Sequence, residues 1–374
     1  MKQLARLATG TVWRSRAGSG GSWAGVGQVR GNGGGRIAEQ GRSVADLGEW
    51  GIIAAIAGRL PAGSLTSVGI GDDAAVVGAP SGSVVAAVDL LLEGRHFRLD
   101  WSSAYDIGVK AAARSLADIA AMGAVSTALL VALAAPGTLP ASWPVELADG
   151  LAAEASRAGA GIVGGDTARA DSVVLSVTAL GDLAGREPVL RSGARPGDMI
   201  AVAGPLGRSA AGLALLMAGA GANAPSVALA GLVAAHLRPS PPYQAGPEAA
   251  ALGATAMIDV SDGLVADLGH IAAASGVALD IDSSSLAAGG PLSEAAAALG
   301  ERSDSSGTDR GFSAPAIALE WMLTGGEDHS LVATFPVSAR LPSPWRVIGQ
   351  VSAGAGVTVD GKPHAGPGGW QHFR

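Results

Sequence analysis

The chain of 374 residues contains no cysteine and very little lysine. The absence of cysteine excludes thiolate catalysis, disulfides, iron–sulfur clusters and cysteine-ligated zinc. Of the 25 basic residues only Lys2, Lys110 and Lys362 are lysines. None of them lies in the Gly-Lys-Ser/Thr sequence of a Walker A loop, in which the lysine reaches the β- and γ-phosphates. The sequence therefore excludes the usual P-loop NTPase.

Charged residues are scarce as well, at 15% of the chain, whereas apolar residues make up 48%. Residues 1–44 carry seven basic residues and one acidic residue, so the rest of the chain is more acidic than the net charge of −7 suggests. An acidic body disfavours nucleic-acid binding, which needs many Lys and Arg contacts to phosphate. Two long uncharged stretches, 119–145 and 209–237, are interrupted by Gly and Pro. We therefore expect buried core elements there and no membrane span.

The distribution of glycine and of apolar periods predicts the domain organisation. Residues 1–44 hold 11 glycines and no apolar period, which predicts a disordered basic extension. Helical and strand patterns alternate after it, and this alternation is typical of an α/β (α+β) protein. We expect an N-terminal domain over 45–182 and a C-terminal α/β domain over 183–374. A polar, Gly- and Ser-rich stretch at 300–313 predicts a mobile insert.

The strongest local pattern is a helix over 102–123. Ser102 or Ser103 can cap it, and Ile107, Ala111 and Ile119 share one face. Strands are predicted over 84–92, 127–134, 173–180, 199–203, 254–260, 277–281, 347–351 and 356–359. Further helices are predicted over 144–158, 209–218 and 247–252, and from residue 264 to 274.

Acidic residues gather beside glycines or at the ends of predicted strands. These carboxylates are Asp73, Asp89, Asp166, Asp259, Asp262 and Glu327, and Asp118 joins them from the predicted helix over 102–123. Any one of them could be an ordinary turn or helix-cap residue. Together, in a chain without cysteine, they favour a hard cation such as Mg²⁺. Mg²⁺ in a glycine-rich cleft indicates phosphate chemistry.

Two other kinds of site receive less support from the residues. Gly159–Gly164 fits G-x-G-x-x-G, but it follows a helix and leads into a strand, which is the reverse of a dinucleotide site. None of the six histidines makes an H-E-x-x-H pair. His96 alone follows the strand that carries Asp89, and we expect it near the same cleft.

Several segments, in their order along the chain, carry a family resemblance. They are Gly71-Asp72-Asp73-Ala74, Asp89 with His96-Phe97, Asp118-Ile119-Ala120-Ala121-Met122-Gly123-Ala124, Gly164-Gly165-Asp166-Thr167, Arg191-Ser192-Gly193, Arg238-Pro239-Ser240-Pro241, Asp259-x-Ser261-Asp262-Gly263-Leu264, Gly325-Gly326-Glu327-Asp328 and Ile348-Gly349. The chain resembles the bacterial thiamine-monophosphate kinases, a family of the aminoimidazole-ribonucleotide-synthetase-like (PurM-like) ATP-binding superfamily. The resemblance covers about residues 45–373.

The resemblance implies a two-domain PurM-like fold and a cytoplasmic homodimer whose N-terminal domains pair through their sheets. It implies transfer of the ATP γ-phosphoryl group to thiamine monophosphate. By motif position Asp73, Asp89, Asp118, Asp166, Asp259 and Asp262 correspond to Mg²⁺ ligands. Gly165, Asp166, Arg191 and Ser261 correspond to ATP-contacting residues, and His96, Glu327 and Trp370 to residues that contact the thiamine phosphate. No catalytic base is implied, because several Mg²⁺ ions and Arg191 would neutralise the phosphate charges.

The chain departs from the family pattern at three places. Ala87-Val88 replaces the usual Ser-Thr before Asp89, Ser115-Leu116-Ala117 replaces Asn-Leu-Ser, and His329 replaces an aromatic residue. These departures leave two alternatives open. The chain could be another ATP-dependent synthetase of the superfamily, or a non-catalytic ATP-binding scaffold.

Overall fold

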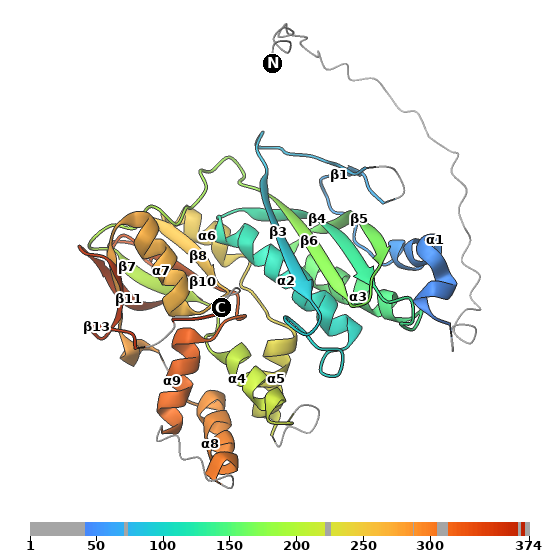
Figure 1. The fold of residues 1–374 in the computed structure, drawn as a ribbon. Coiled ribbons are helices and arrows are strands. Elements are labelled where there is room, and N and C mark those ends of the chain that lie inside the picture. The colour runs from blue at the N-terminus through green and yellow to red at the C-terminus, as the bar shows by residue number, and fades with distance from the viewer. Residues whose placement is uncertain are drawn as a thin grey trace, which may run out of the picture. The chain divides into compact units, whose positions relative to one another are not determined.

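The computed structural model describes residues 42–70, 74–220, 226–286, 288–304, 313–365 and 368–370. The predicted extension therefore lies outside the described residues, except for Arg42 to Val44. Along the chain (Figure 1) the elements are α1 (Val44–Ala57), β1 (Thr66–Val68), β2 (Val76–Val77), β3 (Val85–Leu92), α2 (Ala104–Ala121), β4 (Val125–Ala135), α3 (Trp143–Ala158), β5 (Gly161–Arg169), β6 (Val174–Asp182), β7 (Met199–Ala203), α4 (Arg208–Met217), α5 (Val227–Leu237), α6 (Ala245–Ala251), β8 (Ala256–Val260), α7 (Leu264–Ser275), β9 (Ala278–Ile281), a 3₁₀ turn (Ser283–Ser285), α8 (Pro291–Asp304), α9 (Ala314–Thr324), β10 (Ser330–Phe335), β11 (Arg346–Ser352), β12 (Gly356–Val359) and β13 (Lys362–Pro363).

The N-terminal half, from α1 to β6, is built on a four-stranded sheet with the order β3-β6-β4-β5. Strand β4 pairs antiparallel with β6 and parallel with β5, while β3 pairs antiparallel with β6. Helix α2 packs on this sheet and α3 packs on α2. Among the described residues no helix covers the opposite face of β3, where Val88 and Leu90 are 64% and 55% exposed. We call this the open face of the sheet.

Helix α2 begins as its sequence predicts. Ser103 is the N-cap, and its hydroxyl accepts the backbone N–H of Asp106 while the Asp106 carboxylate accepts from the backbone of Ser103. This reciprocal pair is a capping box, which satisfies two N–H groups at the start of the helix. The predicted cap and helix are therefore confirmed.

Two glycines let α2 and α3 approach closely. A Cβ on Gly108 of α2 would lie 2.2 Å from the Leu147 carbonyl oxygen, and one on Gly150 of α3 would lie 2.1 Å from that of Tyr105. Both distances are far below van der Waals contact. Glycine is thus required at this crossing because backbone occupies the space that a side chain would need.

The C-terminal half, from β7 to β13, holds a seven-stranded sheet with the order β13-β12-β9-β11-β7-β10-β8. Strand β10 lies between β7 and β8 and is buried along its whole length. Its residues alternate between two hydrophobic cores: Leu331, Ala333 and Phe335 join the core that contains α2, and Val332 joins the core beneath α7. One core is therefore shared by the two halves of the chain.

Most predicted elements are present, but α5, α8, α9 and β10 were not predicted, and three predictions differ from the structure. Asp89 lies inside β3 instead of at its end, because the strand continues through the apolar run Leu90-Leu91-Leu92. The segment Gly164–Thr167 lies within β5, a strand that its glycines concealed from the sequence pattern. Helix α8 extends to Asp304, so the first residues of the predicted insert are helical, and 305–312 lie outside the described residues. Within the described ranges no helix is long and apolar enough to cross a membrane.

The glycine crossing yields a stability prediction. Gly108→Ala and Gly150→Ala should each lower the free energy of unfolding by about 1–3 kcal/mol or more, because a methyl group must displace backbone. Gly269→Ala is the control: this helical glycine of α7 has nothing within 4 Å of a built Cβ, and alanine should stabilise it by about 0.5–1 kcal/mol. Thermal unfolding midpoints measure both effects. Equal midpoints for the three variants would contradict the close approach.

Candidate active site

A cavity of about 230 Å³ brings predicted site residues from three separate segments together. Asp118 comes from α2, Asp259 from β8, and Arg191 from the segment that joins the two halves of the chain. Ala87 of β3 and Met122 after α2 complete part of the wall. The structure thus places two predicted metal ligands and one predicted phosphate contact in one cavity.

Several carboxylates lie close together at this cavity, and their negative charges repel one another. Burial, and then the negative charges of Asp259 and Asp89, raise the pKa of Asp118 to about 7. The side chain of Asp89 faces α2, because its Oδ2 accepts the hydroxyl of Ser115 at 3.0 Å. A nearby cation favours ionised carboxylates, so the site is suited to positive charge.

The donor chemistry fits Mg²⁺. Within the described ranges no three acidic or histidine side chains converge closely enough to hold an ion by themselves, and Asp73 lies outside those ranges. Mg²⁺ does not need such a cage, since it is usually held by one or two carboxylates together with water and substrate phosphates. Asp118 and Asp259 carry oxygen atoms that would suit such an ion, and Asp89 lies nearby.

Beside this cavity lies a buried ion cluster that the sequence did not predict. Lys110 Nζ lies 3.1 Å from Glu327 Oε2, and Arg114 also pairs with Glu327. Arg114 reaches Asp89 on its other side, at 3.9 Å. Although burial alone would raise the pKa of Glu327, the charges of Lys110 and Arg114 hold it well below its usual range. Glu327 is therefore an ionised residue held against α2.

The segment around Glu327 is held in an unusual backbone conformation. Glu327 and His329 both have positive φ, 65° and 50°, which non-glycine residues seldom adopt. Between them the buried carboxylate of Asp328 accepts the backbone N–H groups of Gly207 and Ser209 at 2.5 and 2.8 Å. These bonds anchor the segment to the start of α4 and direct Glu327 toward α2.

His329 extends this arrangement to the acidic cavity. Its Nδ1 lies 3.0 Å from Asp259 Oδ2, and both side chains are buried. Burial lowers the pKa of His329, but the hydrogen bond and the charge of Asp259 outweigh it and raise the pKa overall. The residue that departs from the family pattern therefore contacts a predicted metal ligand directly.

Four other predicted residues lie around the loop after β8 and the turn after β3. The backbone N–H groups of Ser261 and Asp262 donate to Asp267 Oδ2. Trp370, 60% exposed, donates its backbone N–H to the Asp262 carbonyl at 3.0 Å. In the turn after β3, His96 Nδ1 accepts the N–H of Leu92 at 2.9 Å, so its Nε2 carries the proton when the ring is neutral.

Gly165 and Asp166 lie on a strand apart from this cavity. They lie on β5, at the opposite edge of the sheet from β3. A Cβ on Gly165 would fall 1.8 Å from the Val131 carbonyl oxygen, so strand pairing alone requires this glycine. The Asp166 carboxylate accepts the N–H of Thr167 at 2.8 Å.

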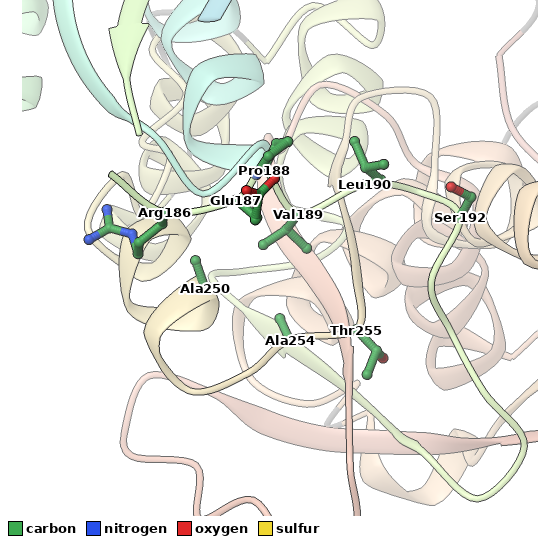
Figure 2. A pocket seen from close by; sticks show the side chains of 9 residues that line it. All are labelled: Arg186, Glu187, Pro188, Val189, Leu190, Ser192, Ala250, Ala254 and Thr255. Atoms are coloured by element: carbon green, nitrogen blue, oxygen red, sulfur yellow. The ribbon is translucent and has the colours of Figure 1, made fainter. Parts of the chain in front are cut away.

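A second, larger cavity of about 480 Å³ lies beside the segment that joins the halves. Figure 2 shows its lining, to which Arg186, Ser192 and Thr255 contribute polar groups, and in this view the Arg186 guanidinium points away from the other labelled side chains. It contains none of the predicted site residues. We therefore assign the chemistry to the smaller, acidic cavity.

Comparison with known proteins agrees with this arrangement. Residues 71–183 match the family model described as AIR synthase related protein, N-terminal domain, and residues 195–313 match its C-terminal domain. Thiamine-monophosphate kinase of Mycobacterium tuberculosis is 48% identical over 90% of this chain and 95% of its own length. That of Corynebacterium glutamicum is 44% identical over 89% and 96%. The chain belongs to the thiamine-monophosphate kinase family.

Solved structures place the fold in the same family. Thiamine-monophosphate kinase from Stenotrophomonas maltophilia superposes with a TM-score of 0.68 at 35% identity, over 83% of this chain and 95% of that one. A structure described as AaThiL complexed with AMPPCP and TMP gives 0.68 at 32% identity, over 88% and 98%. The mixed α/β, two-domain PurM-like architecture expected from the sequence is thus confirmed.

The sequence pattern missed three residues that shape the site, Lys110, Arg114 and Asp267, and it named His329 only as a departure from the family pattern. One signal for the first two was present. Asp106, Lys110, Arg114 and Asp118 recur every four residues and so form a charged row along α2. When one face of a helix is apolar and a neighbouring face carries a row of charges, the charged face is expected to contact polar groups of another part of the chain.

The raised pKa of Asp118 yields a second prediction. The folded chain binds a proton at Asp118 up to about pH 7, whereas the unfolded chain releases it near 3.8. Stability without metal therefore falls as the pH rises from about 4 to 7. Asp118→Asn should raise the unfolding midpoint at pH 8 in EDTA by about 2–5 °C, and this gain should shrink toward pH 4.

The control is Asp149→Asn, which breaks a surface ion pair with Arg59 and should cost at most about 1 kcal/mol. Added Mg²⁺ should raise the midpoint of the unaltered chain more than that of Asp118→Asn, because binding to the native state stabilises it. A lower unfolding midpoint for Asp118→Asn than for the unaltered chain at pH 8 would contradict repulsion between Asp118 and its neighbouring carboxylates.

Proposed function

We propose that the chain is a Mg²⁺-dependent thiamine-monophosphate kinase. It transfers the γ-phosphoryl group of ATP to thiamine monophosphate and produces thiamine diphosphate and ADP. The identity of 48% to a thiamine-monophosphate kinase over 90% of the chain carries this proposal. The cavity shared by Asp118, Asp259 and Arg191 supports it, because carboxylates and an arginine are what a pair of phosphate groups requires.

The reaction needs little proton chemistry. An oxygen of the acceptor phosphate attacks the γ-phosphorus, and the bond from that phosphorus to the β,γ-bridging oxygen breaks, so ADP leaves. The acceptor is a phosphate monoester with a second pKa near about 6, and it is largely dianionic at neutral pH. No general base is therefore required, which agrees with the prediction that none is present.

The side chains then have complementary roles. Arg191 binds the ATP phosphates together with Ser261, while Asp118, Asp259 and Asp89 hold Mg²⁺ with Asp262 and Asp73. Neutralisation of the repulsion between two polyanions is the chemistry that bound Mg²⁺ supplies. His96, Glu327 and Trp370 bind the thiamine monophosphate. Lys110 and Arg114 keep Glu327 ionised and fixed, so that its carboxylate can accept a hydrogen bond from the aminopyrimidine.

The decisive test is incubation of the full chain with ATP, Mg²⁺ and thiamine monophosphate. We expect thiamine diphosphate to form, and the product can be followed by chromatography after oxidation to a fluorescent thiochrome. Omission of Mg²⁺ should abolish turnover. Binding of ATP without any product would instead support a non-catalytic scaffold. A cytoplasmic location stays a prediction.

We further propose that the active unit is a homodimer. The open face of the four-stranded sheet exposes Val88 and Leu90 on the edge strand β3. Contiguous apolar surface of this kind favours association. A second copy of the chain, with the same face, would cover it by a symmetric contact.

The position of Asp166 supports a site shared by two copies. Cross-strand pairs join Asp89 to Val177, Val177 to Val131, and Val131 to Gly165. Asp166, one residue further along β5, consequently points to the opposite face from Asp89. The two strands are also three strand spacings apart, roughly 14 Å. Asp166 therefore cannot reach the cavity of its own chain, and we infer that it serves the site of the partner.

Subunit complementation tests this inference. Asp89→Asn and Asp166→Asn should each abolish turnover as homodimers. When the two are co-expressed and assembled at random, half of the dimers are mixed, and each mixed dimer holds one intact site. Activity should then recover to about a quarter of the unaltered level. No recovery in isolated mixed dimers would place both carboxylates in the site of a single chain.

A further inference from the structure

The carboxylate of Asp267 organises the loop that follows β8. Asp267 lies in the first turn of α7 and is 2% exposed. Its single oxygen Oδ2 accepts three consecutive backbone N–H groups, from Ser261, Asp262 and Gly263, at 3.0, 3.1 and 3.0 Å. Three donors on one oxygen fix the backbone of the whole loop.

The carbonyl groups of the same loop hold two further segments. The Ser261 oxygen accepts the N–H of Glu327 at 2.8 Å, and the Asp262 oxygen accepts the N–H of Trp370 at 3.0 Å. Glycine lies beside each contact: a Cβ on Gly326 or Gly369 would be 2.4 Å from one of these oxygens. The N–H groups of this loop therefore bind Asp267, and its carbonyl groups bind the segments that contain Glu327 and Trp370.

The geometry exceeds what an ordinary helix cap requires. The N-cap of α7 is Gly263, which has no side chain to cap the helix, and its φ of 135° is open only to glycine. Two of the three N–H groups bound by Asp267 belong to Ser261 and Asp262, which precede the N-cap. Asp267 thus shapes the loop outside the helix as well as the start of the helix.

We propose that Asp267 is a positioning residue for the kinase reaction, acting through this loop on both substrates. Through Ser261 and Asp262 it sets side chains assigned to ATP and metal, and through the loop carbonyls it sets the backbone of Glu327 and Trp370, which are assigned to the acceptor. The inference rests on the proposed function. It assigns to one buried carboxylate the alignment of donor and acceptor.

The test compares three variants in the full chain. Asp267→Ala leaves three N–H groups without their acceptor, and we expect KM for ATP and KM for thiamine monophosphate each to rise about tenfold or more, with kcat lowered as well. Asp267→Asn keeps an acceptor oxygen at the same place and should restore both KM values to within about fivefold of the unaltered chain.

Asp198→Ala is the matched control. Asp198 is a buried carboxylate, 6% exposed, that accepts the Arg195 N–H and the Thr255 hydroxyl outside the site. It should lower the unfolding midpoint but leave both KM values unchanged. KM values for Asp267→Ala equal to those for Asp198→Ala would overturn the inference, because a merely structural role predicts that result.

The outcomes separate this inference from the proposed function. If the unaltered chain forms no thiamine diphosphate, the proposed function fails. The inference is then decided by calorimetric titration with ATP and Mg²⁺. Weaker binding to Asp267→Ala than to Asp198→Ala supports a loop set by Asp267, and equal binding overturns it.

Discussion

The charged row on α2 is the constraint on which the site depends. Asp106, Lys110, Arg114 and Asp118 point to the C-terminal half of the chain, and each has a counterpart there. Asp106 pairs with Arg238 at 3.2 Å, Lys110 and Arg114 pair with Glu327, and Asp118 faces Asp259. Buried ion pairs add little net stability, but a partner left alone in the interior is costly. The row therefore fixes the position of α2 against the C-terminal half, and with it the distance between the carboxylates of the two halves.

The shared hydrophobic core holds the charged row of α2 against the C-terminal half of the chain. Because α2 and one face of the seven-stranded sheet bury the same core, the two halves cannot separate without exposing apolar surface. The apolar row of α2 holds the helix against that core, while the charged row sets its rotation and register. Helix α2 thus contributes both to the core and to the site. Two departures from the family pattern also contact carboxylates of the site: Ser115 donates to Asp89, and His329 lies beside Asp259.

The sequence predicted those parts of the molecule that local physics determines. The cap at Ser102 or Ser103, the apolar period of α2 and the start of a helix after β8 are local signals, and the structure has the cap at Ser103 and both helices where expected. The gathering of Asp118 and Asp259 also followed from motif order. The edge position of Asp166 did not, because strand order depends on pairings between distant residues and Gly164-Gly165 concealed the strand. Asp267 carries no signal of its own, since an acidic residue in the first turn of a helix is common.

The burial of Lys110 has a consequence for following the motion of this molecule. Lys110 is 2% exposed and hydrogen-bonded to the His236 carbonyl, whereas Lys362 lies on the surface. Amine-acylating reagents need an accessible, unprotonated amine. Acylation of Lys110 can therefore proceed only when α2 detaches from the segment that holds Glu327. Because the chain has so few lysines, peptide mass analysis can follow the acylation of Lys110 by itself. The rate of that acylation would report how often the two halves open, and the rate at Lys362 gives the reference for an accessible amine.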